Sequence, residues 1–230
     1  MTSSFHDTRW TLVARSRGSD THASAALSEL CEAYYAPVVA FLRRDGREVD
    51  AARELAHDFF AKLLAGGAIE GARPERGRFR SYLLGALKHF AADQRDKAIS
   101  AKRGGGFDHA EMDDEMADAG AGMPDAEFDR QWALTVLARS LSRMEAEMRD
   151  EDKTASFEAL KPWLTVDADS TPQAVAAEKL GLSLEAVKVA IHRLRKRFRE
   201  AVKAEIAQTV SDAGDVREEL DALMQALRNA

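Results

Sequence analysis

Residues 172–200 have the sequence PQAVAAEKLGLSLEAVKVAIHRLRKRFRE, and this stretch decides which fold the chain adopts. Thr171 before Pro172 is typical of a helix start, where a capping residue precedes a proline at the first helical position. Gly181 predicts the end of that helix, and Ser183 is a suitable N-cap for the next one. Two helices joined by a tight glycine turn are the arrangement of helix-turn-helix DNA-binding domains. The stretch therefore predicts such a domain.

The second helix of this pair carries a basic outward face, because residues at steps of three and four share one side of a helix. The residues at these steps are Glu185, Lys188, His192 and Lys196, with Arg193 and Arg197 beside them. We expect the early positions to meet base edges and the later Arg and Lys to meet phosphates. A solvated face on an ordinary helical hairpin is the alternative, but the turn, the cap and the charge together favour DNA binding.

Length and composition fit a helical protein of two small domains. The chain has 230 residues, of which 45% are hydrophobic, 31% charged and 7% aromatic. Ala, Leu, Glu and Arg recur throughout, and this mixture favours helices over turn-rich sandwiches and barrels. We therefore expect an all-α fold of two small helical domains joined by a linker, the second of them a helix-turn-helix.

The net charge of −6 argues against a nucleic-acid partner, but the order of the charges argues for one. From Arg73 to Arg103, nine Lys or Arg stand against three acids, a net charge of +6. From Pro172 to Lys203 there are eight Lys or Arg and three acids, which gives a net charge of +5. Between these basic blocks, the segment from Asp108 to Asp129 has nine acids and no Lys or Arg. Such a segment buries little apolar surface, so we expect a flexible acidic linker.

Apolar residues at helical spacing divide the rest of the chain into segments. They predict helices at residues 25–42, 50–64 and 79–103 in the first half, and further helices from residue 128 to the end of the tail. The expected parts are an N-terminal extension (1–24), a first domain (25–103), the acidic linker (104–127), the helix-turn-helix domain (128–206) and a C-terminal extension helix (207–230).

Three segments resemble the extracytoplasmic-function (ECF) sigma factors of bacterial RNA polymerase. Residues 172–200 resemble the family's fourth conserved region, above all in the LG turn, the Val187-Lys188 pair and the His192-Arg193-x-Arg195 end. ARELAHDFFAKLL (52–64) resembles the helix of the second region that binds the clamp helices of the largest polymerase subunit. RGRFRSYLLGALKHFAADQRD (76–96) resembles the segment that melts and captures the promoter −10 element.

The resemblance implies a sigma factor whose partners are core RNA polymerase and promoter DNA. The residues implied at the −35 element are Ser183, Glu185, Lys188, His192, Arg193, Arg195, Lys196 and Arg197. Those implied at the −10 element are Arg80, Tyr82, Lys88, His89 and Arg95. Those implied at core polymerase are Glu54, Leu55, Asp58, Phe59 and Lys62. An anti-sigma factor or a protein kinase is a further candidate partner.

Aromatic side chains in the −10 segment have two uses, since they can hold unstacked bases or form the core of a helical bundle. We expect Phe79 and Phe90 to lie in the core, and Tyr82, Lys88 and His89 to be exposed.

The polymerase-binding segment departs from the family at its start. Many members have Asp-Ala-Glu-Asp-Leu there, whereas this chain has Ala51-Ala52-Arg53-Glu54-Leu55. Two acids are lost and one Arg is gained, which is expected to weaken or retune polymerase binding by about 1 kcal/mol or less per charge. Glu54 and Asp58 are the remaining acidic candidates.

The sequence contains no catalytic or cofactor motif that we can identify. The six histidines lack metal-ligand spacing, and there is no phosphate loop, Rossmann fingerprint or nucleophile elbow. We therefore expect a protein that is not an enzyme and has no cofactor, no metal and no small-molecule substrate. Because no apolar run approaches the ~18 residues of a membrane span and no secretory signal is present, we expect a cytoplasmic protein without a membrane partner.

Two alternatives remain open from the sequence. The alternative function is a free-standing helix-turn-helix regulator that binds duplex DNA without polymerase.

The tail from Ala207 to Ala230 extends beyond the usual length of the family. One hypothesis is that it packs back on the second domain as a regulatory or capping helix.

Overall fold

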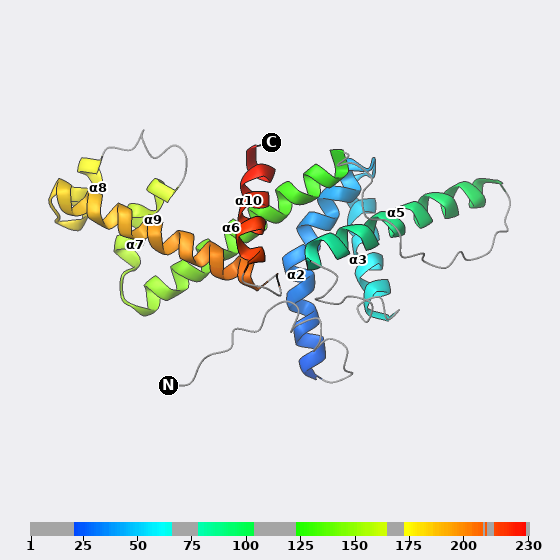
Figure 1. Ribbon diagram of the computed structural model, residues 1–230, viewed down its shortest axis with the longest axis horizontal. Helices are drawn as coiled ribbons and strands as arrows, with labels where there is room; N and C mark the ends of the chain where they lie inside the picture. Colours follow the sequence, from blue (N-terminus) through cyan, green and yellow to red (C-terminus); the bar gives the residue numbers. More distant parts are fainter. Residues whose placement is uncertain are drawn as a thin grey trace. The chain divides into compact units, whose positions relative to one another are not determined.

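A computed structural model describes residues 21–65, 78–103, 123–164, 173–208, 210 and 214–228 (Figure 1). All regular elements in these ranges are helices, which confirms the predicted all-α class. Residues 1–20 of the N-terminal extension and residues 104–122 of the acidic linker lie outside the described residues. Thr171 and Pro172, the predicted start of the helix pair, also lie outside them.

The described helices follow the apolar periodicity of the sequence. In chain order they are α2 (Thr21–Arg44), α3 (Val49–Ala65), α5 (Phe79–Arg103), α6 (Met123–Asp150), α7 (Thr154–Leu160), the 3-10 helix η2 (Lys161–Leu164), α8 (Gln173–Leu180), α9 (Leu184–Ala207) and α10 (Asp215–Arg228). Because α6 already begins at Met123, residues 123–127 are helical rather than part of a flexible linker.

The chain forms two compact units whose bounds differ from the expected domains. Unit 1 comprises residues 1–135 and 207–230, and unit 2 comprises residues 136–206. Helix α6 therefore contributes its first part to unit 1 and its second part to unit 2. The tail helix α10 belongs to unit 1, so the hypothesis that the tail packs on the second domain is wrong. The physical reason is that Glu219 of α10 finds its cationic partners, Arg78 and Arg80, in unit 1.

Aromatic side chains form much of the core of unit 1. The rings of Tyr34 and Phe79 lie edge to face with centroids 5.3 Å apart, and those of Phe59 and Phe90 are 5.5 Å apart. Phe79 and Phe90 are buried, which confirms their predicted core positions. The first part of α6 adds the fully buried ring of Trp132 to the same unit.

Unit 2 has a core of its own, built by α6, α7, η2, α8 and α9. Its buried side chains are Met144, Met148, Phe157, Leu160, Trp163, Ala176, Val187, Ile191 and Leu194. The α9 members of this set recur at steps of three and four residues, so one side of α9 is committed to the core. The opposite side of α9 is left for solvent or a partner.

Helices α2, α6 and α8 end in the same way, with one residue in the left-handed conformation after the last turn. This residue is Gly46 after α2 and Gly181 after α8, but after α6 it is Asp152, with a φ of +56°. The N–H of Lys153 donates to the carbonyl of Met148 at 2.8 Å and closes the end of α6. A side chain at such a position is strained, whereas glycine adopts the conformation freely.

Replacing Asp152 by glycine is therefore expected to stabilise unit 2. We expect Asp152→Gly to raise the free energy of unfolding by about 0.5–1 kcal/mol, since it removes the backbone strain and a negative charge at the C-terminal end of a helix. Urea denaturation followed by circular dichroism measures the change. Asp152→Ala removes the same charge but keeps the strained conformation, so an equal gain in that variant would contradict the explanation.

Candidate nucleic-acid interface

The turn between α8 and α9 is fixed by backbone and side-chain hydrogen bonds. Gly181 has a φ of +62°, and the N–H of Leu182 donates to the carbonyl of Ala177 at 3.0 Å. At the start of α9, the hydroxyl oxygen of Ser183 accepts a hydrogen bond from the N–H of Ala186 at 3.2 Å. The predicted glycine stop and serine cap are therefore confirmed. Together they set the direction in which α9 leaves the turn.

The outward face of α9 is exposed as the spacing predicted. Glu185, Lys188, His192, Arg193 and Lys196 are all exposed. The ammonium group of Lys188 lies 2.8 Å from the carboxylate of Glu185, one turn earlier on the same face. An exposed pair of this kind contributes about 0–1 kcal/mol, so a ligand can replace it at little cost. This face presents several cations to solvent from one rigid helix.

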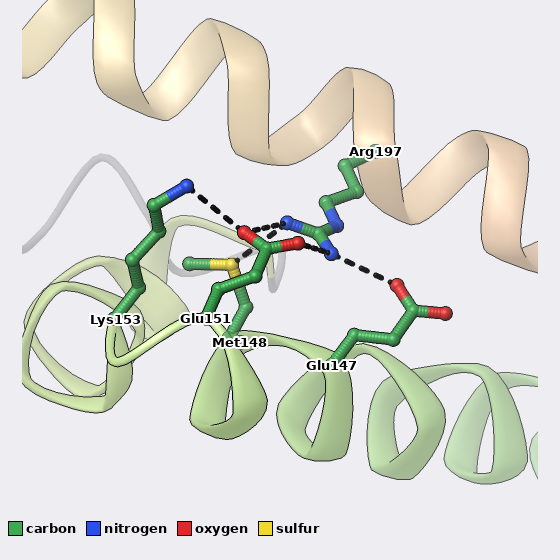
Figure 2. A network of polar contacts seen from close by, with 5 residues as sticks. All are labelled: Glu147, Met148, Glu151, Lys153 and Arg197. Carbon is green, nitrogen blue, oxygen red and sulfur yellow. Dashed lines mark hydrogen bonds and ion pairs between the residues drawn. The ribbon is translucent and has the colours of Figure 1, made fainter.

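Two arginines assigned to this face have partners within unit 2, although Arg195 is itself exposed. The Nε of Arg195 donates to the carbonyl oxygen of Trp163 at 2.9 Å and ties α9 to η2. Figure 2 shows the guanidinium of Arg197 held by Glu151 at 2.7 Å and by Glu147 at 3.0 Å. Its Nη1 also lies 3.1 Å from the sulfur of Met148. The assignment of Arg197 to phosphate binding stays a prediction, and in this state its donors are engaged by carboxylates.

The Arg197 cluster changes the acidity of its members. Hydrogen bonds from Arg197 and then from Lys153 lower the pKa of Glu151 to about 2 from its ordinary 4.5. Reciprocally, the hydrogen bond to Glu151 raises the pKa of Arg197 despite partial burial. The carboxylate is therefore charged at any pH at which the protein is handled, and the cluster remains ionic.

Beside this cluster, unit 2 has an open groove of about 680 Å³ between α9 and the α6–α7 region. Leu160, Leu182 and Val189 line its apolar part, and Arg193 lines its edge. Leu182 and Val189 are 42% and 49% exposed. Exposed apolar side chains in one groove are typical of a protein-binding surface. Helix α9 thus has an apolar flank next to its cationic face.

The cations assigned to the −10 element are paired within unit 1. Arg80 is buried, forms ion pairs with Asp129 and Glu219, and its guanidinium lies 4.5 Å from the centre of the Trp132 ring. In this state the buried and doubly paired guanidinium is not presented to a ligand, and its assignment to the −10 element stays a prediction. Burial alone would lower the pKa of Arg80, but the charges of Asp129 and Glu219 outweigh burial and raise it.

The other candidates on α5 are partly exposed or already paired, and Arg95 is exposed. Lys88 Nζ lies 2.5 Å from a carboxylate oxygen of Asp125, and Arg95 Nη1 lies 2.5 Å from one of Asp45. The expectation that Tyr82, Lys88 and His89 are exposed is corrected, because all three are only partly exposed.

Helix α3 presents a mixed face to solvent. Glu54, Asp58 and Lys62 are exposed, as expected for residues that contact a partner, whereas Leu55 is half-buried. Phe59 is only 3% exposed and packs in the core, so its assignment as a polymerase contact stays a prediction without support from its exposure. Lys62 Nζ lies 3.1 Å from Asp93 of α5, so one of the three exposed charges already has a partner.

Sequence reasoning missed the acids that neutralise α5, and Glu219 is the clearest case. It lies on the apolar side of α10, three residues after Val216 and four before Leu223. An acid on a buried stripe requires a cation, so this pattern was a readable signal. Asp125 and Asp129 carried no such signal, because they occur among the nine acids of the segment from Asp108 to Asp129.

Residues 21–65, 78–103, 123–164, 173–208, 210 and 214–228 offer neither a metal site nor a membrane span. Among those residues, no group of three or more His, Cys, Asp or Glu side chains could hold a metal ion. None of the helices there combines the length and the apolar character needed to cross a lipid bilayer. Comparisons with protein families, curated proteins and solved structures gave no significant match.

The Arg197 cluster generates a prediction about pH. Because its folded pKa lies below the ordinary value, Glu151 adds stability above about pH 4.5 and this contribution is lost as the pH falls through about 2. In low salt, a carboxyl carbon NMR titration should find the Glu151 pKa near 2, and Arg197→Gln should move it toward 4.5. Arg193→Gln removes a charge one turn away and should leave the titration almost unchanged. An unshifted titration in Arg197→Gln would rule out this account.

Proposed function

We propose that the chain is a sigma factor of the ECF type, which binds core RNA polymerase and directs it to promoters. The observation that carries the proposal is the exposed cationic face of α9, on a helix whose direction is set by the Gly181 turn and the Ser183 cap. The resemblance of residues 52–64, 76–96 and 172–200 to the family supports it. A sigma factor needs no catalytic group of its own, because polymerase makes the phosphodiester bonds.

At the −35 element, the proposed reader is the first half of α9. Lys188 and His192 are placed to reach base edges, while Arg193 and Lys196 serve the phosphates. Glu185 has two roles, as the present partner of Lys188 and as an acceptor for a cytosine amino group. Arg195 and Arg197 support this reader indirectly, because they hold α9 against η2 and α6.

At core polymerase, the proposed contact is the exposed side of α3. Glu54 and Asp58, one turn apart, supply negative charge to basic groups of the partner. Arg53 pairs with Asp50 at 3.4 Å, so the arginine that departs from the family pattern is partly neutralised within its own helix. The apolar groove of unit 2 is a second surface suited to a protein partner, which favours a polymerase subunit over a protein that binds DNA alone.

The test is whether the purified chain forms a 1:1 complex with core polymerase and starts transcription at a defined site. Gel filtration with core polymerase and run-off transcription on genomic fragments measure both. A free-standing helix-turn-helix regulator would instead protect a duplex operator by itself and would not co-elute with polymerase. That second outcome would overturn the proposal and establish the alternative.

A double substitution on α9 tests the assigned reader. Lys188→Ala with His192→Ala should reduce promoter selectivity at the upstream element by about tenfold or more, because a lost base contact costs ~1–3 kcal/mol. Polymerase binding should be unchanged. Lys203→Ala removes the same charge near the far end of α9 and should have little effect on selectivity. Loss of polymerase binding in the double variant would show that the reader is assigned to the wrong unit.

A further inference from the structure

Helix α10 is held on the start of α5 by charge within unit 1. Glu218 forms an ion pair with Arg78, and Glu219 lies 3.3 Å from Arg78 and 3.2 Å from Arg80. Arg78 is the more accessible of the two cations, with 27% of its side chain exposed, and Glu218 is 69% exposed. The contact therefore has an outer part open to solvent and an inner part that is buried.

The inner part is imperfectly satisfied. Glu219 is 1% exposed, yet neither of its carboxylate oxygens has a hydrogen-bond partner among the described residues. Its ion pairs with Arg78 and Arg80 are thus Coulombic contacts without well-formed hydrogen bonds. A buried carboxylate in this state is less stable than one that is fully bonded.

Apolar packing adds little to hold α10 in place. Within the helix as described, Leu223 is the only buried apolar side chain, Val216, Leu220 and Leu227 are partly buried, and Met224 is 49% exposed. Helices with few buried apolar contacts open more readily than the core beside them. Helix α10 is accordingly expected to open more readily than the α2–α3–α5 core beside it.

The groups that α10 covers are suited to another ligand. Guanidinium groups bind phosphate with the same paired donors that they offer to carboxylate. A nucleic-acid backbone and the two glutamates of α10 therefore compete for the same N–H groups of Arg78 and Arg80. Arg80 also has Asp129, so Arg78 is the cation that gains most when α10 leaves.

We propose that α10 is an autoinhibitory cover, whose Glu218 and Glu219 occupy a phosphate-binding surface formed by Arg78 and Arg80. This inference rests on the proposed function, because the covered surface lies in the segment assigned to the promoter −10 element. Single-stranded DNA and α10 exclude each other at this surface. Release of α10 converts unit 1 from a weak to a stronger binder of single strands.

The test compares two neutralised acids on the same helix of the full chain. Glu219→Gln removes a charge from the covered contact, whereas Asp221→Asn removes one from the exposed side of α10. Binding of a fluorescein-labelled single-stranded DNA oligonucleotide is measured by anisotropy in low salt, without polymerase. We expect Glu219→Gln to bind roughly tenfold more tightly than the parent chain and Asp221→Asn to differ little from it. Adding Arg78→Ala to Glu219→Gln should abolish the gain.

Hydrogen exchange distinguishes release of the cover from loss of the fold. In Glu219→Gln, amides of α10 should exchange at least several-fold faster while those of α2 and α3 keep their protection. Joint loss of protection in all three helices would overturn the proposal, because α10 would then be part of the core. An equal gain in Asp221→Asn, or release of α10 without tighter DNA binding, would also overturn it. Because polymerase is absent, failure of the sigma-factor proposal would appear separately, in the co-elution experiment.

Discussion

Unit 1 is organised around one buried cation, the guanidinium of Arg80. A charge that is buried without compensation is strongly destabilising, so the surrounding elements must supply anions and a favourable surface. Asp129 from α6 and Glu219 from α10 supply the charges, and Trp132 supplies the face of its ring. One side chain of α5 therefore draws together segments from the middle and the end of the chain. The inclusion of α10 in unit 1 follows from this requirement.

Pairing of this kind also decides how much of the positive charge between Arg73 and Arg103 is open to a ligand. A count of charges describes the segment, but the field that a ligand meets depends on what is paired with those charges. Arg78, Arg80, Lys88 and Arg95 each have a carboxylate partner within unit 1. The outward face of α9 is different, since the ion pair of Lys188 with Glu185 on it is exposed and local. Two basic blocks of similar net charge, +6 and +5, thus give paired cations on α5 and a more open cationic face on α9.

Local signals in the sequence predicted local structure well. The glycine stop at Gly181, the cap at Ser183 and the burial of Phe79 and Phe90 all follow from a few neighbouring residues. The inward position of Arg197 was not predictable in this way, because its partners Glu147 and Glu151 lie on another helix about 50 residues away in sequence. For the candidate site, the exposed face of α9 was predictable, whereas the pairing of each cation was a property of the fold.

Two buried acids show where the sequence still carried unused information. Glu205 and Glu219 each lie among apolar residues at helical spacing, and such a position requires a cation from a neighbouring helix. Glu205 has two such cations in unit 2. Its carboxylate oxygens accept hydrogen bonds from Arg139 at 2.8 Å and from Arg143 at 2.7 Å. Glu219 has ion-pair partners but no hydrogen bond. The two acids share one sequence signal, yet only the contact of Glu219 is loose enough for a competing anion to replace it.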